Sequence, residues 1–205
     1  MNPLTAKLRK YFVMGSQDCI RDPEETLLEA IQAGITTFQY REKGPNSLSG
    51  EAEVELGRKL RKICKDHGVL FIINDKVDLA ETLDADGIHV GQGDAPVEKV
   101  REQFPDKIIG ISVTSVDEVK KSRIDLVDYV RAGPIYATQT KPGKKPAGLA
   151  WLQDIRKLHP ELPIVAIGGI KPENADTVLD AGADGLAVVT AISHSDQIKE
   201  AVHNL

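Results

Sequence analysis

The run from Gln39 to Lys43 places two cations, Arg41 and Lys43, on either side of Glu42, directly after an apolar stretch. Successive side chains of an extended backbone alternate between its two faces, so the cations point to one side and Glu42 to the other. Guanidinium and ammonium groups bind phosphate oxygens directly, and two of them side by side could form a phosphate-sized site. A solvated loop of mixed charge is the alternative interpretation.

Carboxylate and amide groups follow two later apolar runs. Asn74 and Asp75 directly follow one run, and Asp94 follows the next. Two carboxylates at neighbouring strand ends could hold one Mg²⁺, which prefers oxygen ligands and keeps water or substrate phosphates in its shell. Helix capping is the alternative, because Asp75 precedes an expected helix and Asp94 stands two residues before Pro96.

The longest polar connection runs from Gly133 to Pro146. Its length and its content of Gly, Pro, Thr and Lys favour a lid or a binding loop within the segment Gly133–Gly148. Its hydroxyls and lysines would complement an anion, and a plain surface loop is the alternative. The polar side chains at its centre are Thr138, Gln139, Thr140 and Lys141.

Two further residue pairs, Gly168-Gly169 and Val189-Thr190, stand at the ends of the last two apolar runs. In barrels of alternating strands and helices, phosphate commonly binds at this position, and glycine lets backbone N–H groups approach the anion. The pairs therefore predict a second anion site, although they name a ligand group and not a reaction. His89 lies inside an expected strand, which favours a structural role over acid or base chemistry.

The elements that must position these residues are short β-rich apolar runs alternating with amphipathic segments of helical period. The expected strands are Tyr11–Met14, Thr36–Tyr40, Leu70–Ile73, Gly87–Val90, Ile108–Ser112, Tyr129–Arg131, Ile164–Ile167 and Leu186–Val189. The expected helices include Pro23–Ala33, Ser49–Asp66, Val77–Leu83 and Pro172–Leu179. Eight such units with short connections predict a closed (β/α)₈ TIM barrel formed by residues 1–205 as one domain, with every polar cluster at one end.

Bulk properties restrict the class of protein. Apolar residues make up 41 % and charged residues 28 % of 205 residues, which is a globular composition, and the formal charge of −5 argues against a nucleic-acid binder. Two cysteines, Cys19 and Cys64, without metal-like spacing fit packing in a reducing compartment. The first residues contain no apolar run typical of a signal peptide, and no stretch is long enough for a membrane span. We expect a cytoplasmic protein that acts on small molecules.

Taken in order along nearly the whole chain, these motifs resemble those of the thiamine-phosphate synthase family. That family joins hydroxymethylpyrimidine diphosphate to a thiazole phosphate, releases pyrophosphate and forms thiamine phosphate. The matching phrases are Tyr11–Gln17, Gln39–Lys43, Ile73–Asp75, Asp86–Gln92 with Asp94, Gly133–Tyr136 with Thr138–Lys141, and Ile167–Ile170.

The resemblance implies a role for each matching residue. The pyrimidine diphosphate would be held by Gln39, Tyr40, Arg41, Glu42, Lys43, Asn74, Ser112 and Lys141, of which Arg41, Lys43, Ser112 and Lys141 would be catalytic. The thiazole phosphate would be held by Thr138, Gln139, Thr140, Gly168 or Gly169, Val189 and Thr190. Asp75 and Asp94 would bind one Mg²⁺ per subunit, and the resemblance implies a cytosolic enzyme that can form homo-oligomers.

One residue departs from the family pattern. The family often has a histidine two residues after the serine equivalent to Ser112, where this chain has Thr114. Thiazole tautomerases of the same superfamily use that histidine and lack the paired aspartates, so the pattern here favours the synthase. A silent phosphate-binding barrel is a further alternative, which the joint presence of both aspartates, Arg41 and Lys141 disfavours.

Overall fold

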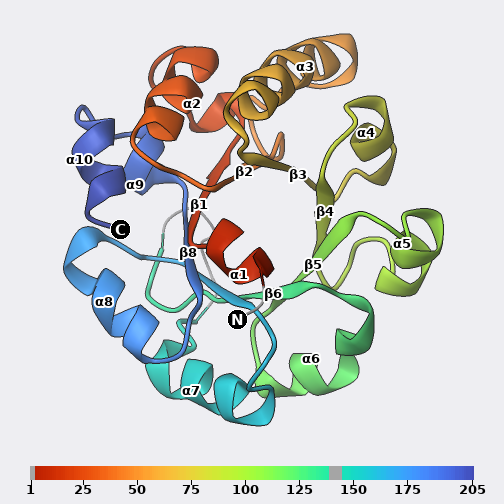
Figure 1. The fold of residues 1–205 in the computed structure, drawn as a ribbon, viewed down its shortest axis with the longest axis vertical. Coiled ribbons are helices and arrows are strands. Elements are labelled where there is room, and N and C mark those ends of the chain that lie inside the picture. Colours follow the sequence, from red (N-terminus) through yellow and green to blue (C-terminus); the bar gives the residue numbers. More distant parts are fainter. Residues whose placement is uncertain (1–2, 139–144) are drawn as a thin grey trace.

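The strands close into a single barrel. The computed structural model describes residues 3–138 and 145–205. Eight strands pair in parallel in chain order, and β8 pairs with β1. Figure 1 shows the helices as a ring around the strands. The predicted (β/α)₈ barrel is confirmed.

The predicted strands are all present, with ends that differ by no more than one residue. The strands are β1 (Lys10–Met14), β2 (Thr37–Tyr40), β3 (Leu70–Asn74), β4 (Gly87–Val90), β5 (Ile108–Val113), β6 (Tyr129–Ala132), β7 (Ile164–Ile167) and β8 (Gly185–Val188). The helices are α1 (Pro3–Lys7), α2 (Pro23–Gln32), α3 (Gly50–His67), α4 (Val77–Thr82), α5 (Val97–Gln103), α6 (Val116–Lys121), α7 (Gly148–Leu158), α8 (Pro172–Asp180), α9 (Thr190–Ser193) and α10 (Ile198–His203). In the described part of the chain, none of them is long and apolar enough to span a membrane.

Local signals explain where the helices begin and end. Asp22 caps α2 by accepting the N–H groups of Glu24 and Glu25, and Pro23 fills the first helical position. Helix α3 ends at Gly68, whose φ of 68° is the left-handed conformation that glycine adopts without cost.

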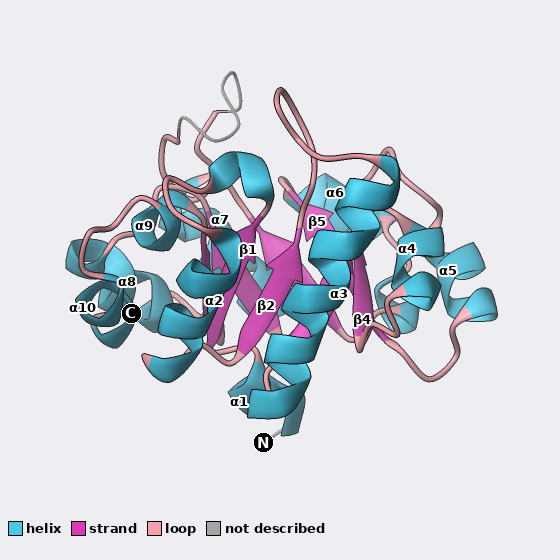
Figure 2. Cartoon of the chain, turned by 90° about the horizontal axis from the view of Figure 1, so that it is seen from above, coloured by secondary structure: helices cyan, strands magenta, loops and turns pink. Residues whose placement is uncertain are grey.

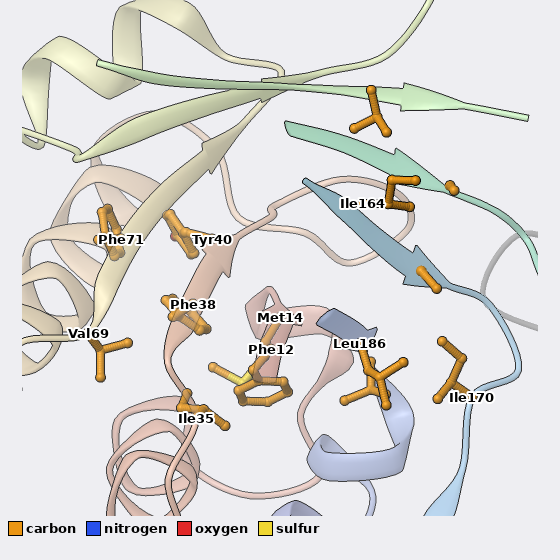
Figure 3. Close-up of a cluster of buried hydrophobic side chains, with 14 of the residues drawn as sticks. Phe12, Met14, Ile35, Phe38, Tyr40, Val69, Phe71, Ile164, Ile170 and Leu186 are labelled. Atoms are coloured by element: carbon orange, nitrogen blue, oxygen red, sulfur yellow. The ribbon is translucent and has the colours of Figure 1, made fainter. Parts of the chain in front are cut away.

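Successive side chains of each strand point alternately outward to the helices and inward to the barrel axis. The buried side chains therefore form two clusters. The larger cluster lies between barrel and helices and includes Phe12, Phe38 and Phe71, whose neighbouring rings are 5.8 and 5.9 Å apart (Figure 3). The smaller cluster combines inward side chains with Leu8, which follows α1. Helix α1 lies across one mouth of the barrel (Figures 1 and 2), so polar chemistry is confined to the opposite mouth.

A repeated clamp closes the amino-terminal ends of the strands. An aspartate just before an even-numbered strand accepts the backbone N–H of the preceding strand and pairs with an arginine of an outer helix. Asp184, for example, accepts the N–H of Ile164 at 2.8 Å and also pairs with Arg156. On the first strand pair the hydroxyl of Thr36 accepts the N–H of Lys10 at 3.0 Å. The three aspartate–arginine clamps are Asp86–Arg61, Asp128–Arg101 and Asp184–Arg156.

We expect Asp184→Ala to lower the free energy of unfolding by about 1–3 kcal/mol, because it removes the acceptor for a backbone N–H and a charged partner. Urea denaturation measures this change. Asp125→Ala is the control, since Asp125 pairs with Arg123 at an exposed position and should change stability little. An equal loss in both variants would contradict the clamp.

Candidate active site

A cavity of about 230 Å³ opens at the carboxyl ends of β2 to β6. It lies at the end of the barrel opposite α1, where Figure 2 shows the longer loops. Its polar lining brings together most of the residues predicted for the diphosphate and the metal. The lining comprises Arg41, Lys43, Asn74, Asp75, Gly91, Gln92, Gly93, Asp94, Ser112, Thr114, Glu118 and Arg131.

The alternation predicted after β2 is confirmed, since Arg41 and Lys43 line the cavity and Glu42 does not. Glu42 is buried, and its carboxylate accepts the N–H and hydroxyl of Ser16 and the N–H of Leu48. It therefore ties the loops after β1 and β2 together.

Tyr40 also points away from the cavity. It lies between β2 and α3, and its hydroxyl donates to the carbonyl oxygen of Glu53 at 3.0 Å. The structure thus does not bring Tyr40 or Glu42 to the place expected for the pyrimidine diphosphate. The cause is the strand period, which sends alternate residues of one motif to opposite faces.

The two aspartates converge on one cation. The ammonium Nζ of Lys43 lies 2.5 Å from Oδ2 of Asp75 and 3.9 Å from Oδ1 of Asp94. The capping alternative is wrong, because the N-cap residues of α4 and α5 are Lys76 and Pro96.

Additional oxygen ligands would have to complete a metal site. Across residues 3–138 and 145–205, no group of three or more His, Cys, Asp or Glu side chains could hold a metal ion. Asp75 and Asp94 would therefore bind Mg²⁺ together with water or phosphate oxygens, as this ion usually does.

A closed ring of hydrogen bonds lies inside the barrel, below the cavity. Each side chain contacts the next at 2.5 to 3.1 Å. The members, in order around the ring, are Tyr11, Gln39, Arg131, Ser112, His89 and Tyr129. His89 is fully buried and contacts Ser112 and Tyr129, so it supports the cavity from below.

The ionisation of this ring follows from its burial. Burial raises the pKa of Tyr11 to about 12 and raises that of Tyr129 well above its ordinary value, so both hydroxyls stay neutral. Burial also lowers the pKa of Arg131, but a guanidinium starts so far above neutrality that it remains charged. The ring thus holds one cation among neutral groups.

Sequence reasoning missed four side chains of the cavity. Glu118 accepts the N–H of Thr114 at 2.7 Å, and the amide of Gln92 donates to the carbonyl oxygen of Ser112 at 2.9 Å. Arg131 had a visible signal, because an arginine in the middle of an apolar strand requires a polar interior. Gln92 and Thr114 stand in loops and Glu118 in the short helix α6, where spacing along the chain does not show that they face the cavity.

The residues predicted for the second anion site lie around the carboxyl ends of β7 and β8. Gly168 and Gly169 have φ values of 101° and 65°, and Tyr136 donates its N–H to the carbonyl oxygen of Gly168 at 2.9 Å. A methyl group on Gly168 would approach Cβ of Pro134 to 2.5 Å, so only glycine fits beneath this loop.

The rest of this group is only partly within the described residues. Val189 precedes α9 and Thr190 begins it, directly after β8. Thr138 is described, whereas Gln139, Thr140 and Lys141 lie outside the described residues.

The cysteines have no chemical role in this site. Burial raises the pKa of Cys19 to about 12 and raises that of Cys64 well above its ordinary value. Both thiols are therefore protonated at neutral pH and unsuited to act as nucleophiles.

Comparison with known proteins decides the family. The profile described as thiamine monophosphate synthase matches residues 10–192. The chain belongs to the thiamine monophosphate synthase family. It is 58 % identical over 199 residues to the thiamine-phosphate synthase of Oceanobacillus iheyensis, covering 97 % of each chain.

Two further relatives also match over nearly the whole chain. Identity to the thiamine-phosphate synthase of Streptococcus agalactiae serotype Ia is 46 %, covering 97 % of this chain and 90 % of that protein. The thiamine phosphate pyrophosphorylase structure from Pyrococcus furiosus aligns with a TM-score of 0.87 and 33 % identity, covering 98 % of this chain and 95 % of that one.

Proposed function

We propose that this chain condenses hydroxymethylpyrimidine diphosphate with a thiazole phosphate, or with its carboxylated form, in the cytoplasm. The products are thiamine phosphate and pyrophosphate, with carbon dioxide as a third product when the carboxylated thiazole reacts, so the reaction is a step of thiamine biosynthesis. Full-length identity of 58 % to a thiamine-phosphate synthase is the observation that carries this proposal. The cavity supports it, because it combines cations for a diphosphate with two convergent carboxylates.

The diphosphate end of the pyrimidine substrate binds beside Arg41 and Lys43. Asn74 and Ser112 line the same cavity and supply neutral hydrogen-bonding groups to the same substrate. Lys141, in the segment between β6 and α7, would add a further cation. Tyr40 and Glu42 support this site from behind, by the contacts to Glu53 and to Ser16 that hold the Arg41 segment in place.

Asp75 and Asp94 are the proposed ligands of one Mg²⁺. The residues fit such an ion, because both carboxylates already converge on the ammonium group of Lys43 in the cavity. When bound, Mg²⁺ supplies positive charge that stabilises the departing diphosphate.

The thiazole phosphate binds at the ends of β7 and β8. The turn at Gly168 and Gly169 leaves room for backbone N–H groups to approach an anion, and Thr190 begins a helix beside it. Thr138 stands on the loop above, and Val189, Gln139 and Thr140 complete the proposed set. The two phosphate-bearing substrates thus approach each other from neighbouring sectors of one barrel mouth.

The proposed reaction is a dissociative substitution. The bond between the pyrimidine methylene carbon and the diphosphate oxygen breaks, and its electron pair leaves with the diphosphate. The electron-rich aminopyrimidine stabilises the resulting cation, and the thiazole nitrogen then donates its lone pair to the methylene carbon. Arg41 and Lys43 stabilise the charge that develops on the leaving group. No enzyme nucleophile is needed, which agrees with the protonated thiols of Cys19 and Cys64.

Lys43→Met is expected to tighten binding of Mg²⁺ to the substrate-free protein by about two- to tenfold, because it removes a cation that competes for the same carboxylates. Isothermal titration with Mg²⁺ measures this change. Lys62→Met is the control, since Lys62 forms an exposed ion pair with Asp66 on α3. Unchanged or weaker binding in Lys43→Met would contradict the assignment.

Pyrophosphate release tests the function itself. The purified protein is supplied with hydroxymethylpyrimidine diphosphate, thiazole phosphate and Mg²⁺ together, and then with each omitted in turn. Release that requires all three, with formation of thiamine phosphate, supports the synthase. Folded protein that binds thiazole phosphate but releases no pyrophosphate would favour a thiazole tautomerase or a silent binder.

A further inference from the structure

Arg131 is a buried cation whose hydrogen-bond partners are neutral, and the carboxylate of Asp75 in the same cavity pairs with Lys43. The side chain of Arg131 stands on β6 and only 4 % of the residue is exposed. The guanidinium donates to Oε1 of Gln39 at 2.5 Å and to Oγ of Ser112 at 3.0 Å. No carboxylate of residues 3–138 or 145–205 forms an ion pair with it.

Burying a guanidinium that forms no ion pair costs free energy in the ligand-free protein. A charge removed from water needs an opposite charge or a full set of hydrogen bonds, and here the two partners are uncharged. A guanidinium has five N–H donors, so the bonds to Gln39 and Ser112 leave donors for a ligand. An anion entering the cavity would supply the missing opposite charge.

The cavity that Arg131 lines indicates where such an anion would bind. Arg131 lines it together with Arg41 and Lys43, the two cations already placed at the diphosphate. On the other side, the ring through Gln39 and Ser112 fixes the guanidinium to four other strands of the barrel. A fixed guanidinium at the floor of the cavity is preorganised to bind oxyanions, since it loses little freedom on binding.

We propose that Arg131 binds the diphosphate of the pyrimidine substrate, and the pyrophosphate product, as a further cation of this site. The inference rests on the proposed function. Electrostatics selects the diphosphate end over the pyrimidine ring. A buried positive charge beside the ring would oppose the cation that forms there, whereas the same charge beside the diphosphate stabilises the leaving group.

The test is calorimetric binding of inorganic pyrophosphate with Mg²⁺ to the intact chain and to Arg131→Met and Arg131→Lys. We expect about 10- to 100-fold weaker binding in Arg131→Met, the loss typical of a buried charge-assisted hydrogen bond. Arg131→Lys should recover part of the affinity. In steady-state kinetics the KM for pyrimidine diphosphate should rise, while the KM for thiazole phosphate stays the same.

Matched variants separate binding from support of the fold. Tyr129→Phe removes one hydroxyl of the ring but keeps the guanidinium, and it should bind pyrophosphate within about threefold of the parent chain. If Arg131→Met does not fold, Arg131→Gln replaces it in the comparison with Arg131→Lys. Equal pyrophosphate affinity in the charged and uncharged variants would overturn the proposal.

Failure of this inference differs from failure of the proposed function. If Arg41→Met loses pyrophosphate binding while Arg131→Met keeps it, the synthase assignment stands and the role of Arg131 is overturned. If the parent chain neither binds pyrophosphate nor releases it from the substrates, both proposals are overturned.

Discussion

Asp75→Asn is expected to lower the turnover number by about 100- to 1,000-fold, since a metal that stabilises a leaving group contributes several kcal/mol to the barrier. Asparagine keeps the size of the side chain but loses the charge that faces Lys43 in the cavity. The melting temperature should change by no more than about 3 °C, because the substitution removes no packed apolar group. Steady-state kinetics and thermal unfolding of the same preparation measure both quantities.

Asparagine is a better replacement than alanine at this position. Asp75 has a φ of 62°, a left-handed conformation that Asp and Asn tolerate and alanine disfavours. Asp75→Ala would therefore combine loss of the carboxylate with backbone strain, and we expect it to lower both turnover and stability, turnover by far the more.

A matched control stands at the opposite end of the barrel. Asp84 also has a positive φ, of 48°, and its side chain is exposed between α4 and β4. Asp84→Asn should leave turnover unchanged. If Asp75→Asn lost stability and turnover in equal measure, or if its apparent affinity for Mg²⁺ matched that of the parent chain, the metal-ligand role would be wrong.

Gly168→Ala is expected to raise the KM for thiazole phosphate by about 10- to 100-fold, the scale of effect that a displacement near 1 Å produces at a binding site. The added methyl group would collide with Pro134 and force the β6–α7 loop away from the turn after β7. Binding of pyrophosphate should weaken much less than binding of thiazole phosphate, because Arg41 and Lys43 line the diphosphate cavity from the end of β2 and, of its proposed cations, only Lys141 belongs to the displaced segment. Varying each substrate separately in steady-state kinetics distinguishes the two effects.

Gly34 provides the control for this prediction. Its φ of 105° is close to the 101° of Gly168, but a methyl group there would meet no atom within 4 Å. Gly34→Ala thus imposes similar backbone strain without the collision, and it should lower stability without changing the KM for either substrate. An equal rise of the KM in both variants would refute a specific role for the turn at Gly168.

The barrel could be predicted from the sequence because its signals are local. Apolar runs of strand length, an N-cap followed by proline at Asp22-Pro23, and a glycine at the end of α3 each depend on a few adjacent residues. The proximity of Asp75 and Asp94 was also accessible, since Asp75 directly follows β3 and Asp94 lies in the loop after the neighbouring parallel strand β4.

Other parts of the site depend on contacts that no local pattern records. The motif Gln39–Lys43 was assigned to the ligand as a block, whereas Tyr40 and Glu42 face α3 and the loop after β1. The ring through Arg131 joins residues far apart in the sequence, and it needs the register that places Ser112 opposite Arg131. Spacing along one strand cannot supply that register.

The clamps at the amino-terminal ends divide the barrel into consecutive two-strand cassettes. Each of Asp86, Asp128 and Asp184 ties its strand to the preceding strand and to the helix before that strand, so the contacts of a clamp stay inside one cassette. The boundaries between cassettes fall in the loops after β2, β4 and β6, which also line the mouth of the barrel. Crossovers between relatives in these loops should therefore exchange substrate-facing segments while every clamp stays intact.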